Sequence, residues 1–203
     1  MRLCLEHGRR DDLETLHPAY FALVMATGIV SIATDLHGIP VLPKILFWLN
    51  ALFLAGLVTA TVARIAFCSR AFAADIQSHS RGVGFFTTVA AIAVFVTELV
   101  LLMDAAGIAA VFWIAAAVLW FVTIYGVLAL LTVKPDKPSL AEGLNGGWLV
   151  STVASQALAM LTVLISATGI FAGLERPLLF AALVLWLGGG ALYLWIMTLI
   201  FFR

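Results

Sequence analysis

Hydroxyl side chains recur at helical spacing in two apolar stretches of the sequence. At about 100° per residue, four hydroxyl residues of the stretch from Gly146 to Thr168 fall within a stripe about 60° wide: Ser151, Ser155, Thr162 and Ser166. The first apolar stretch carries a similar stripe, in line with Tyr20: Thr27, Ser31 and Thr34. For a single Ser or Thr, a hydrogen bond to a neighbouring helix is the default role in a membrane. Because the pattern recurs, we interpret it as the lining of a polar pathway.

Glu98 is the carboxylate that lies well inside an apolar stretch, in line with Thr87 on the same predicted helix. Ionising an acid within a membrane is costly, so such residues are usually functional or paired. Two roles stay open: a proton carried in step with transport, or a bond to a structural partner. The plainer interpretation is a carboxylate near the membrane surface that water reaches.

Asn145-Gly146-Gly147 interrupts the chain where the Gly146–Thr168 stretch begins. Glycines allow close backbone approach, and N–H groups at a helix start attract anions. The segment follows a helix stop, Lys134-Pro135-Asp136-Lys137-Pro138, and the residues Ser139 and Glu142, which have capping-box spacing. An anion contact and a plain packing notch are equally compatible with this pattern.

The sequence offers no set of residues for catalysis, metal binding or a nucleotide cofactor. It has no phosphate-binding loop, dinucleotide fingerprint or nucleophile elbow, and its two cysteines lack metal-type spacing. All four histidines fall in predicted tails or loops: His7, His17, His37 and His79. We therefore expect a protein that is not an enzyme, uses no cofactor or metal, and binds no nucleic acid.

Six long apolar stretches must position these residues. At 64% hydrophobic and 11% charged, with a mean hydropathy of +1.13, the chain of 203 residues is far more apolar than a soluble domain. Each stretch is near the ~20 residues that cross a bilayer as a helix. The stretches are Pro18–Thr34, Pro43–Phe67, Gly82–Met103, Gly107–Val133, Gly146–Thr168 and Pro177–Phe202. The predicted fold is an all-α polytopic membrane protein, with a tail over residues 1–17 and a transmembrane domain over residues 18–203.

The positions of the Lys and Arg residues predict the topology. Of the 11, all but Lys44 and Arg176 fall in the N-terminal tail, at the even-numbered connections or at the C-terminus. By the positive-inside rule, both termini lie in the cytoplasm. Asp11 and Glu14 precede the first stretch, so we do not expect a cleaved signal peptide. The expected location is the inner (plasma) membrane of a bacterium, with Arg64 snorkelling to the inner headgroups.

Short outer connections and longer, charged inner ones pair the six spans as three helical hairpins. Taken together, the first, third and fifth spans hold more Ser, Thr, Asn and Gln than the second, fourth and sixth. We therefore expect these odd-numbered helices to face the interior. The run Gly188-Gly189-Gly190 in the sixth span is expected to receive a neighbouring helix.

Three segments at the starts of the odd-numbered spans occur together in one order. They read HPAYFALVMATG at 17–28, HSRGVGFFT at 79–87 and KPSLAEGLNGGW at 137–148. In this combination the chain resembles the tellurite-resistance/C4-dicarboxylate transporter family, which includes the plant slow-type anion channels. The resemblance implies ten helices in five hairpins around a central pore, with odd helices lining it and protomers often forming trimers. It also implies transport of small anions such as malate and other C4-dicarboxylates, sulfite, chloride or nitrate, with a link to tellurite resistance in some members.

On this plan the anion is held by hydroxyls, backbone N–H groups and helix ends rather than by a fixed cation. The predicted pore-lining or substrate-binding residues come from the starts and polar stripes of the odd spans, with two aromatic residues near the inner mouth. They are Thr27, Gly28, Ser31, Phe85, Phe86, Thr87, Asn145, Gly146, Gly147, Ser151 and Ser155. Glu98 is the candidate for proton coupling.

The chain holds three of the family's five hairpins and ends at Arg203. Three hairpins cannot enclose a five-hairpin pore, and polar stripes that face lipid are unfavourable. We therefore expect a partial version of the fold. The leading function is transport of small anions across the bilayer by a channel or carrier. The alternative is a truncated, non-transporting membrane subunit that associates with a full-length relative.

Overall fold

The computed structural model describes residues 13–133, 135 and 138–203, and every regular element in these ranges is a helix. The elements are η1 (Pro18–Phe21), α2 (Ala22–Leu36), α3 (Leu42–Phe67), α4 (Ser69–Ile76), η2 (Gly82–Phe85), α5 (Phe86–Met103), α6 (Ala106–Val133), α7 (Leu140–Gly143), η3 (Gly146–Trp148), α8 (Leu149–Ala167) and α9 (Glu175–Phe201). Most of the predicted tail, including Cys4, lies outside the described residues, as do Lys134 and Lys137 of the predicted helix stop.

Six helical segments of the described chain are long and apolar enough to cross a membrane. They are Pro18–Leu36, Leu42–Phe67, Gly82–Met103, Ala106–Val133, Gly146–Ala167 and Glu175–Phe201. This confirms the predicted fold class and the number of spans. The bounds differ from the predicted ones only at the ends. For example, α9 begins at Glu175 instead of Pro177, because the first turn accepts a proline and favours a carboxylate.

Each odd-numbered span begins with a short 3-10 turn. In η1, His17 caps the turn: its Nδ1 accepts the backbone N–H of Ala19 at 3.1 Å, and Pro18 follows with its φ already fixed. In η3, the Oδ1 of Asn145 accepts the N–H of Gly147 at 2.8 Å. The turns pack in sequence, η1 on η2 and η2 on η3. The three spans therefore start side by side at one end of the bundle.

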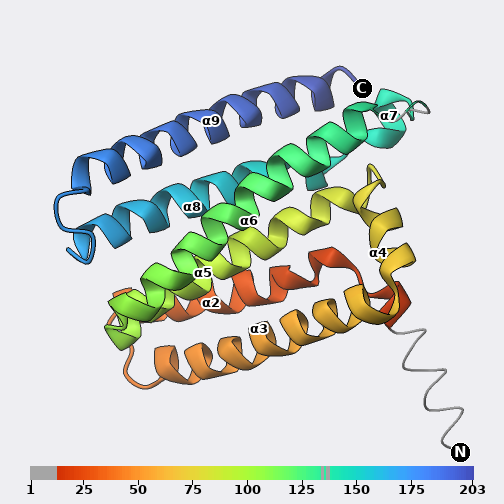
Figure 1. Cartoon of the computed structure of the whole chain (residues 1–203). Coiled ribbons are helices and arrows are strands. Elements are labelled where there is room, and N and C mark those ends of the chain that lie inside the picture. Colours follow the sequence, from red (N-terminus) through yellow and green to blue (C-terminus); the bar gives the residue numbers. More distant parts are fainter. Residues whose placement is uncertain (1–12, 134, 136–137) are drawn as a thin grey trace, which may run out of the picture.

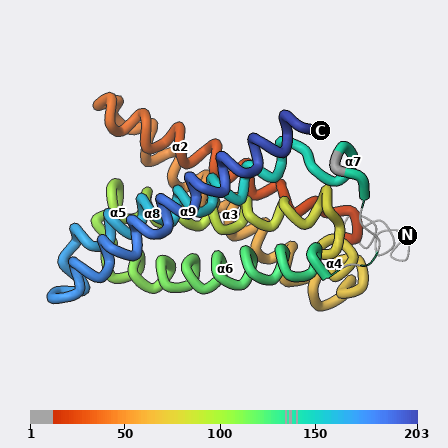
Figure 2. The backbone as a smooth tube through the Cα atoms, turned by 90° about the horizontal axis from the view of Figure 1, so that it is seen from above, coloured from red at the N-terminus to blue at the C-terminus, as the bar shows by residue number. Residues whose placement is uncertain are grey.

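The hairpins are α2–α3, α5–α6 and α8–α9, and α5 is the central helix. It packs against α2, α3, α6 and α8, while α9 packs against α8. The connections within the hairpins lie at one end, and α4, α7 and the C-terminus lie at the other (Figure 1). In the view from above, α2 and α6 lie on opposite sides of α5 (Figure 2).

Burial divides the odd-numbered spans. Within an apolar stretch of 18 residues in each span, 61% and 56% of the residues are buried in the third and fifth spans, against 28% or less in the others. The expectation that odd helices face the interior therefore holds for α5 and α8. The corresponding stretch of α2 is only 22% buried, because α2 lies at the edge of the bundle and its main helix contacts are α3 and α5, so the orientation of α2 toward a shared pathway stays a prediction.

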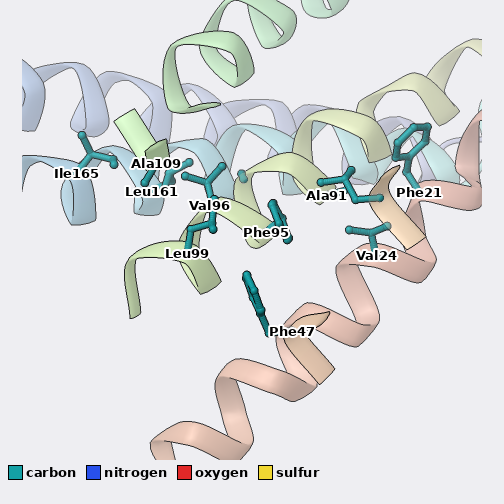
Figure 3. Close-up of a cluster of buried hydrophobic side chains, with 12 residues drawn as sticks. Phe21, Val24, Phe47, Ala91, Phe95, Val96, Leu99, Ala109, Leu161 and Ile165 are labelled. Atoms are coloured by element: carbon teal, nitrogen blue, oxygen red, sulfur yellow. The ribbon is translucent and has the colours of Figure 1, made fainter. Parts of the chain in front are cut away.

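Small and aromatic side chains join α5 to its neighbours. Ala91 and Ala93 are buried and let adjacent helices approach closely. Phe47 of α3 stacks on Phe95 of α5, with the ring centroids 5.5 Å apart, and Figure 3 shows the two rings between the ribbons. The even helices expose large apolar side chains instead, as helices facing lipid do. Examples are Trp48, Leu52, Phe121, Trp186 and Trp195.

The glycine run of the sixth span receives α8 through one residue. A Cβ at Gly189 would lie 3.0 Å from Nε2 of Gln156 and 3.2 Å from Cβ of Ser155. A Cβ at Gly188 or Gly190 would meet open space. The predicted packing role is therefore confirmed for Gly189.

Candidate functional site

A buried polar pair joins α3 to α5. Nδ2 of Asn50 donates to Oε2 of Glu98 at 2.5 Å, and neither residue has exposed surface. The interpretation of Glu98 as a carboxylate that water reaches is therefore wrong. The residue lies inside the bundle because Asn50, 48 residues away in the sequence, supplies a partner on the facing helix.

Two predicted site residues of α2 lie beside this pair or one turn from it. A Cβ at Gly28 would lie 2.7 Å from Nδ2 of Asn50 and 3.0 Å from Oε2 of Glu98, so a glycine is needed for the three helices to meet. Ser31 is fully buried and donates to the carbonyl of Pro43 on α3 at 2.9 Å. Thr27, next to Gly28, is half-buried.

Two tryptophans of α6 bond to the hydroxyl stripe of α8. Nε1 of Trp113 donates to Oγ1 of Thr162, and Nε1 of Trp120 donates to Oγ of Ser155, each at 2.9 Å. The two hydroxyls donate in turn to carbonyls of their own helix. In this stripe, Ser155 and Thr162 serve helix packing. The hydroxyl pattern alone does not identify the tryptophans; the signal in the sequence is their seven-residue spacing, which matches that of the two hydroxyls.

The start of the third span is fastened to the start of the first. Oγ1 of Thr87 lies 3.0 Å from the carbonyl of Pro18 and 2.6 Å from that of Gly84. A Cβ at Gly84 would lie 3.1 Å from the backbone N of Ala19. Phe85 contacts the ring of Phe72 on α4 edge-on, with centroids 5.2 Å apart. These contacts explain why glycine and threonine occur where the two turns cross.

The start of the fifth span has both a packing contact and exposed backbone, which are the two interpretations that the sequence left open. Asn145 already accepts the N–H of Gly147, and a Cβ at Gly147 would lie 3.6 Å from Val83 of η2, which is a packing contact. Gly146 is exposed, and a Cβ there would meet nothing within 4 Å. Ser139 and Glu142, which have capping-box spacing, bond to each other before this turn: Oε2 of Glu142 accepts from Oγ of Ser139 at 2.9 Å.

A charged cluster holds the segment before η1. Asp75 of α4 pairs with Arg64 at 2.7 Å and with Arg81 at 2.8 Å. Arg64 also donates to the carbonyl of Glu14 at 2.9 Å, and Arg81 donates to that of Leu16 at 3.2 Å. The predicted snorkelling of Arg64 is wrong: it is 2% exposed, because α4 folds back and places Asp75 over it.

His17 lies at the edge of this cluster. Burial of the ring, and then the nearby Arg81 guanidinium, lower the pKa of His17 below its usual 6.5 and outweigh the opposite effect of Asp75. The neutral ring keeps Nδ1 free to cap η1. A histidine is therefore suited to this cap as long as it stays uncharged.

A cavity of about 290 Å³ opens between the ends of α6, α8 and α9, near α7. Two predicted site residues, Phe86 and Ser151, line it together with His79, Trp148 and Trp195. The hydroxyl of Ser151 donates to the carbonyl of Trp148 at 2.7 Å. The cavity lies on the side of the even helices, so it is not a passage between α2, α5 and α8.

The predicted site residues therefore do not converge on one binding site. Gly28 lies at the Asn50–Glu98 pair, Thr87 fastens two span starts, and Ser155 bonds to α6. What the odd-numbered spans share is position: they are consecutive neighbours, and their starts meet at one end.

The six apolar spans define a polytopic helical membrane protein, in which the odd-numbered spans begin side by side at one end. The sequence matches the family model of the SLAC1 voltage-dependent anion channel over residues 15–203. The chain therefore belongs to this anion channel family, and the resemblance noted from the three segments is confirmed. The family is one of channels and transporters, not of enzymes. Neither the comparison with curated proteins nor that with solved structures found a match.

Proposed function

We propose that α2, α5 and α8 form one side of a pathway for small anions, with C4-dicarboxylates such as malate as the substrate class. The observation that carries this proposal is the shared end of the odd-numbered spans, where η1, η2 and η3 pack in sequence. Membership of an anion channel family supports the anionic substrate. The choice of dicarboxylates over sulfite, chloride or nitrate rests on the resemblance of the three segments.

Exposure separates the predicted lining residues into two groups. A residue that touches a permeating anion needs accessible surface, so the buried Gly28, Ser31, Phe86, Thr87, Ser151 and Ser155 position helices. Thr27, Phe85, Asn145, Gly146 and Gly147 keep partly or fully exposed surface. Within this second group we assign contact with the anion to Thr27, Asn145 and Gly146, through a hydroxyl, an amide and a backbone N–H group, because the N–H of Gly147 is already bonded to Asn145.

The charged cluster supports an anion entrance at the end where the odd spans start. It holds two guanidinium groups, Arg64 and Arg81, and one carboxylate, Asp75, which leaves one positive charge. The Arg81 side chain is 32% exposed, so part of this charge reaches the surface. A positive entrance raises the local concentration of anions.

We propose that the same end lies in the cytoplasm of a bacterium. The positive-inside rule supports this orientation, since α4 and the C-terminus lie at that end and carry Arg70 and Arg203. Both termini would then be cytoplasmic, in the inner membrane. We propose association into trimers on the basis of the family resemblance alone. The orientation is tested by placing single cysteines at positions 70 and 176 and labelling intact cells. If the orientation is correct, a membrane-impermeant reagent labels only position 176.

Transport is tested by reconstituting the purified chain into liposomes and measuring uptake of labelled malate against protein-free liposomes. Sulfite, chloride and nitrate serve as competitors. We expect uptake that falls in Thr27→Val and stays unchanged in Leu52→Met, whose side chain is 67% exposed on α3, the second span, which faces lipid. A folded chain without uptake above the protein-free background contradicts transport by this polypeptide.

The low burial of α2 favours a second candidate, a non-transporting subunit that associates with a longer relative. Ile29 of α2 and Tyr20 of the preceding turn η1 are more than half exposed, and a partner would cover such a surface. Co-expression with a ten-helix family member, followed by affinity purification, tests this candidate. Recovery of the chain alone, without the relative, would argue against it.

A further inference from the structure

We infer that Glu98 is held as a neutral carboxylic acid, with its Oε1–H donated to Oδ1 of Asn50 so that the two side chains share two hydrogen bonds. The first of these bonds, from Nδ2 of Asn50 to Oε2 of Glu98, is present at 2.5 Å. The inference concerns the remaining oxygen of each side chain. It is independent of the proposed function.

The two remaining oxygens are both buried and both lack a hydrogen-bond partner. An ionised carboxylate offers only acceptors, and the amide oxygen of Asn50 is also an acceptor. With Glu98 ionised, two acceptors are therefore left without a hydrogen between them. One proton on Oε1 removes this mismatch, because it supplies the missing donor to a planar amide that already shares one bond with the same carboxyl group.

The nearby hydroxyl of Ser31 does not fill that place. Ser31, one turn along α2 from Gly28, also approaches the Glu98 carboxyl group, but it gives its single hydroxyl hydrogen to the carbonyl of Pro43. The ion pairs of the described residues belong to Asp75, and none includes Glu98. Neither the cavity between α6, α8 and α9 nor the smaller one beside Arg64 is lined by Asn50 or Glu98.

The cost of burial favours the same form. An ionised carboxylate inside a bilayer is expensive unless a cation or several donors surround it, whereas a neutral acid bonded to an amide has little charge to solvate. The polar neighbours of Glu98 are Asn50 on α3 and Ser31 on α2, Gly28 lies beside them, and none of the three is charged. The proton therefore serves as part of the contact between α3 and α5.

Of the two roles that the sequence left open, the neutral form of Glu98 fits the bond to a structural partner and not the proton carrier. A carboxyl group that holds its proton to complete a bond with Asn50 is a positioning residue, which does not release the proton during transport. The Glu98→Gln substitution keeps the shape and both bonds, since an amide replaces the acid and donates from its nitrogen. Asn50→Leu, in contrast, leaves the buried acid without a partner.

Infrared spectra of the full chain in lipid nanodiscs at neutral pH test the inference. The difference between wild type and Glu98→Gln should contain the carbonyl stretching band of a protonated carboxylic acid. The double variant Asn50→Asp with Glu98→Gln, which exchanges acid and amide, should regain the band. A difference spectrum with carboxylate bands in its place would overturn the inference.

Thermal unfolding gives a second readout that needs no spectral assignment. We expect Glu98→Gln to keep the wild-type melting temperature and Asn50→Leu to lower it, or to prevent folding. If Glu98→Gln lowers the melting temperature as much as Asn50→Leu does, the acid is more than a neutral partner and the inference fails.

Discussion

The two halves of the bundle hold their helices together in different ways. On the side of α2, α3 and α5, the buried polar groups include ionisable ones: Glu98, Arg64 and Asp75. On the side of α6, α8 and α9, the contacts between α6 and α8 are neutral, an indole N–H on a hydroxyl, made twice along the helix pair.

This difference predicts how each half responds to change. An indole and a hydroxyl keep their hydrogen bond at any ordinary pH, and losing one such bond between membrane helices costs little. A buried charge that loses its partner costs several times more. Substitutions in the first half should therefore destabilise the protein more than substitutions of similar size in the second half.

The largest effect is expected at the charged cluster. Arg64→Met removes a partner of the buried Asp75 while keeping most of the apolar stem, and we expect a loss of about 3 kcal/mol in unfolding free energy. Arg81 still pairs with Asp75, which keeps the loss near the lower end for a buried pair. Reversible unfolding in mixed detergent micelles measures it. Arg70→Met is the matched control, because Arg70 is exposed; equal losses in the two variants would refute the importance of burial.

A somewhat smaller effect is expected at the Asn50–Glu98 pair. In Gly28→Ala the new Cβ would lie 2.5 Å from Cγ1 of Val94 as well as against Asn50, so the helices must shift, at a cost of about 1–3 kcal/mol. The matched control is Gly56→Ala, where a Cβ on α3 meets nothing within 4 Å. This control should be neutral or stabilising by up to ~1 kcal/mol. Comparable destabilisation by both substitutions would mean that Gly28 is not a contact point.

The neutral half should respond least to the loss of a hydrogen bond. A double-mutant cycle of Trp120→Phe and Ser155→Ala isolates one indole–hydroxyl bond, and we expect a coupling energy of about 0.6 kcal/mol. Trp186→Phe, at an exposed indole, reports the cost of the smaller ring alone. A coupling energy as large as the Arg64 effect would remove the contrast between the halves.

The smallest effect is a pH dependence at His17. Its pKa is lowered in the folded protein, so folded molecules bind fewer protons than unfolded ones below the usual 6.5. The stabilisation is fully present above that pH and is lost as the pH falls through the folded pKa. Melting temperatures between about pH 8 and pH 5 should show a decline that His17→Asn reduces, since Asn also caps helices but does not titrate. An identical decline in this variant would assign it to other groups.

The sequence predicted the spans and their family because local features determine both. A helix that crosses lipid must be apolar over about 20 residues, and this requirement is visible without any knowledge of packing. The three segments at the starts of the odd spans were also readable, since Pro18, Gly84 and Asn145 each meet a local requirement of a 3-10 turn or of two turns that cross.

The roles of the polar side chains were less predictable because they depend on partners far along the chain. Helical spacing identified Ser31 and Ser155 but could not tell a lumen from a neighbouring helix, and the structure bonds them to α3 and α6. The partner of Glu98 is 48 residues away, and nothing in the local pattern points to Asn50. The short helix α4, which carries Asp75 to Arg64, lies in a loop that hydropathy does not resolve.

The central claim is that the odd-numbered helices border an aqueous pathway, and the reactivity of Thr27→Cys tests it most directly. In a background with Cys4→Ser and Cys68→Ala, a water-soluble anionic thiol reagent should modify this cysteine, because thiols react as thiolates in water, and malate should slow the reaction. Ile29→Cys, on the opposite face of α2 by helical spacing, should stay unmodified in a bilayer. An unreactive Thr27→Cys, or equal reactivity at both positions, would contradict the claim.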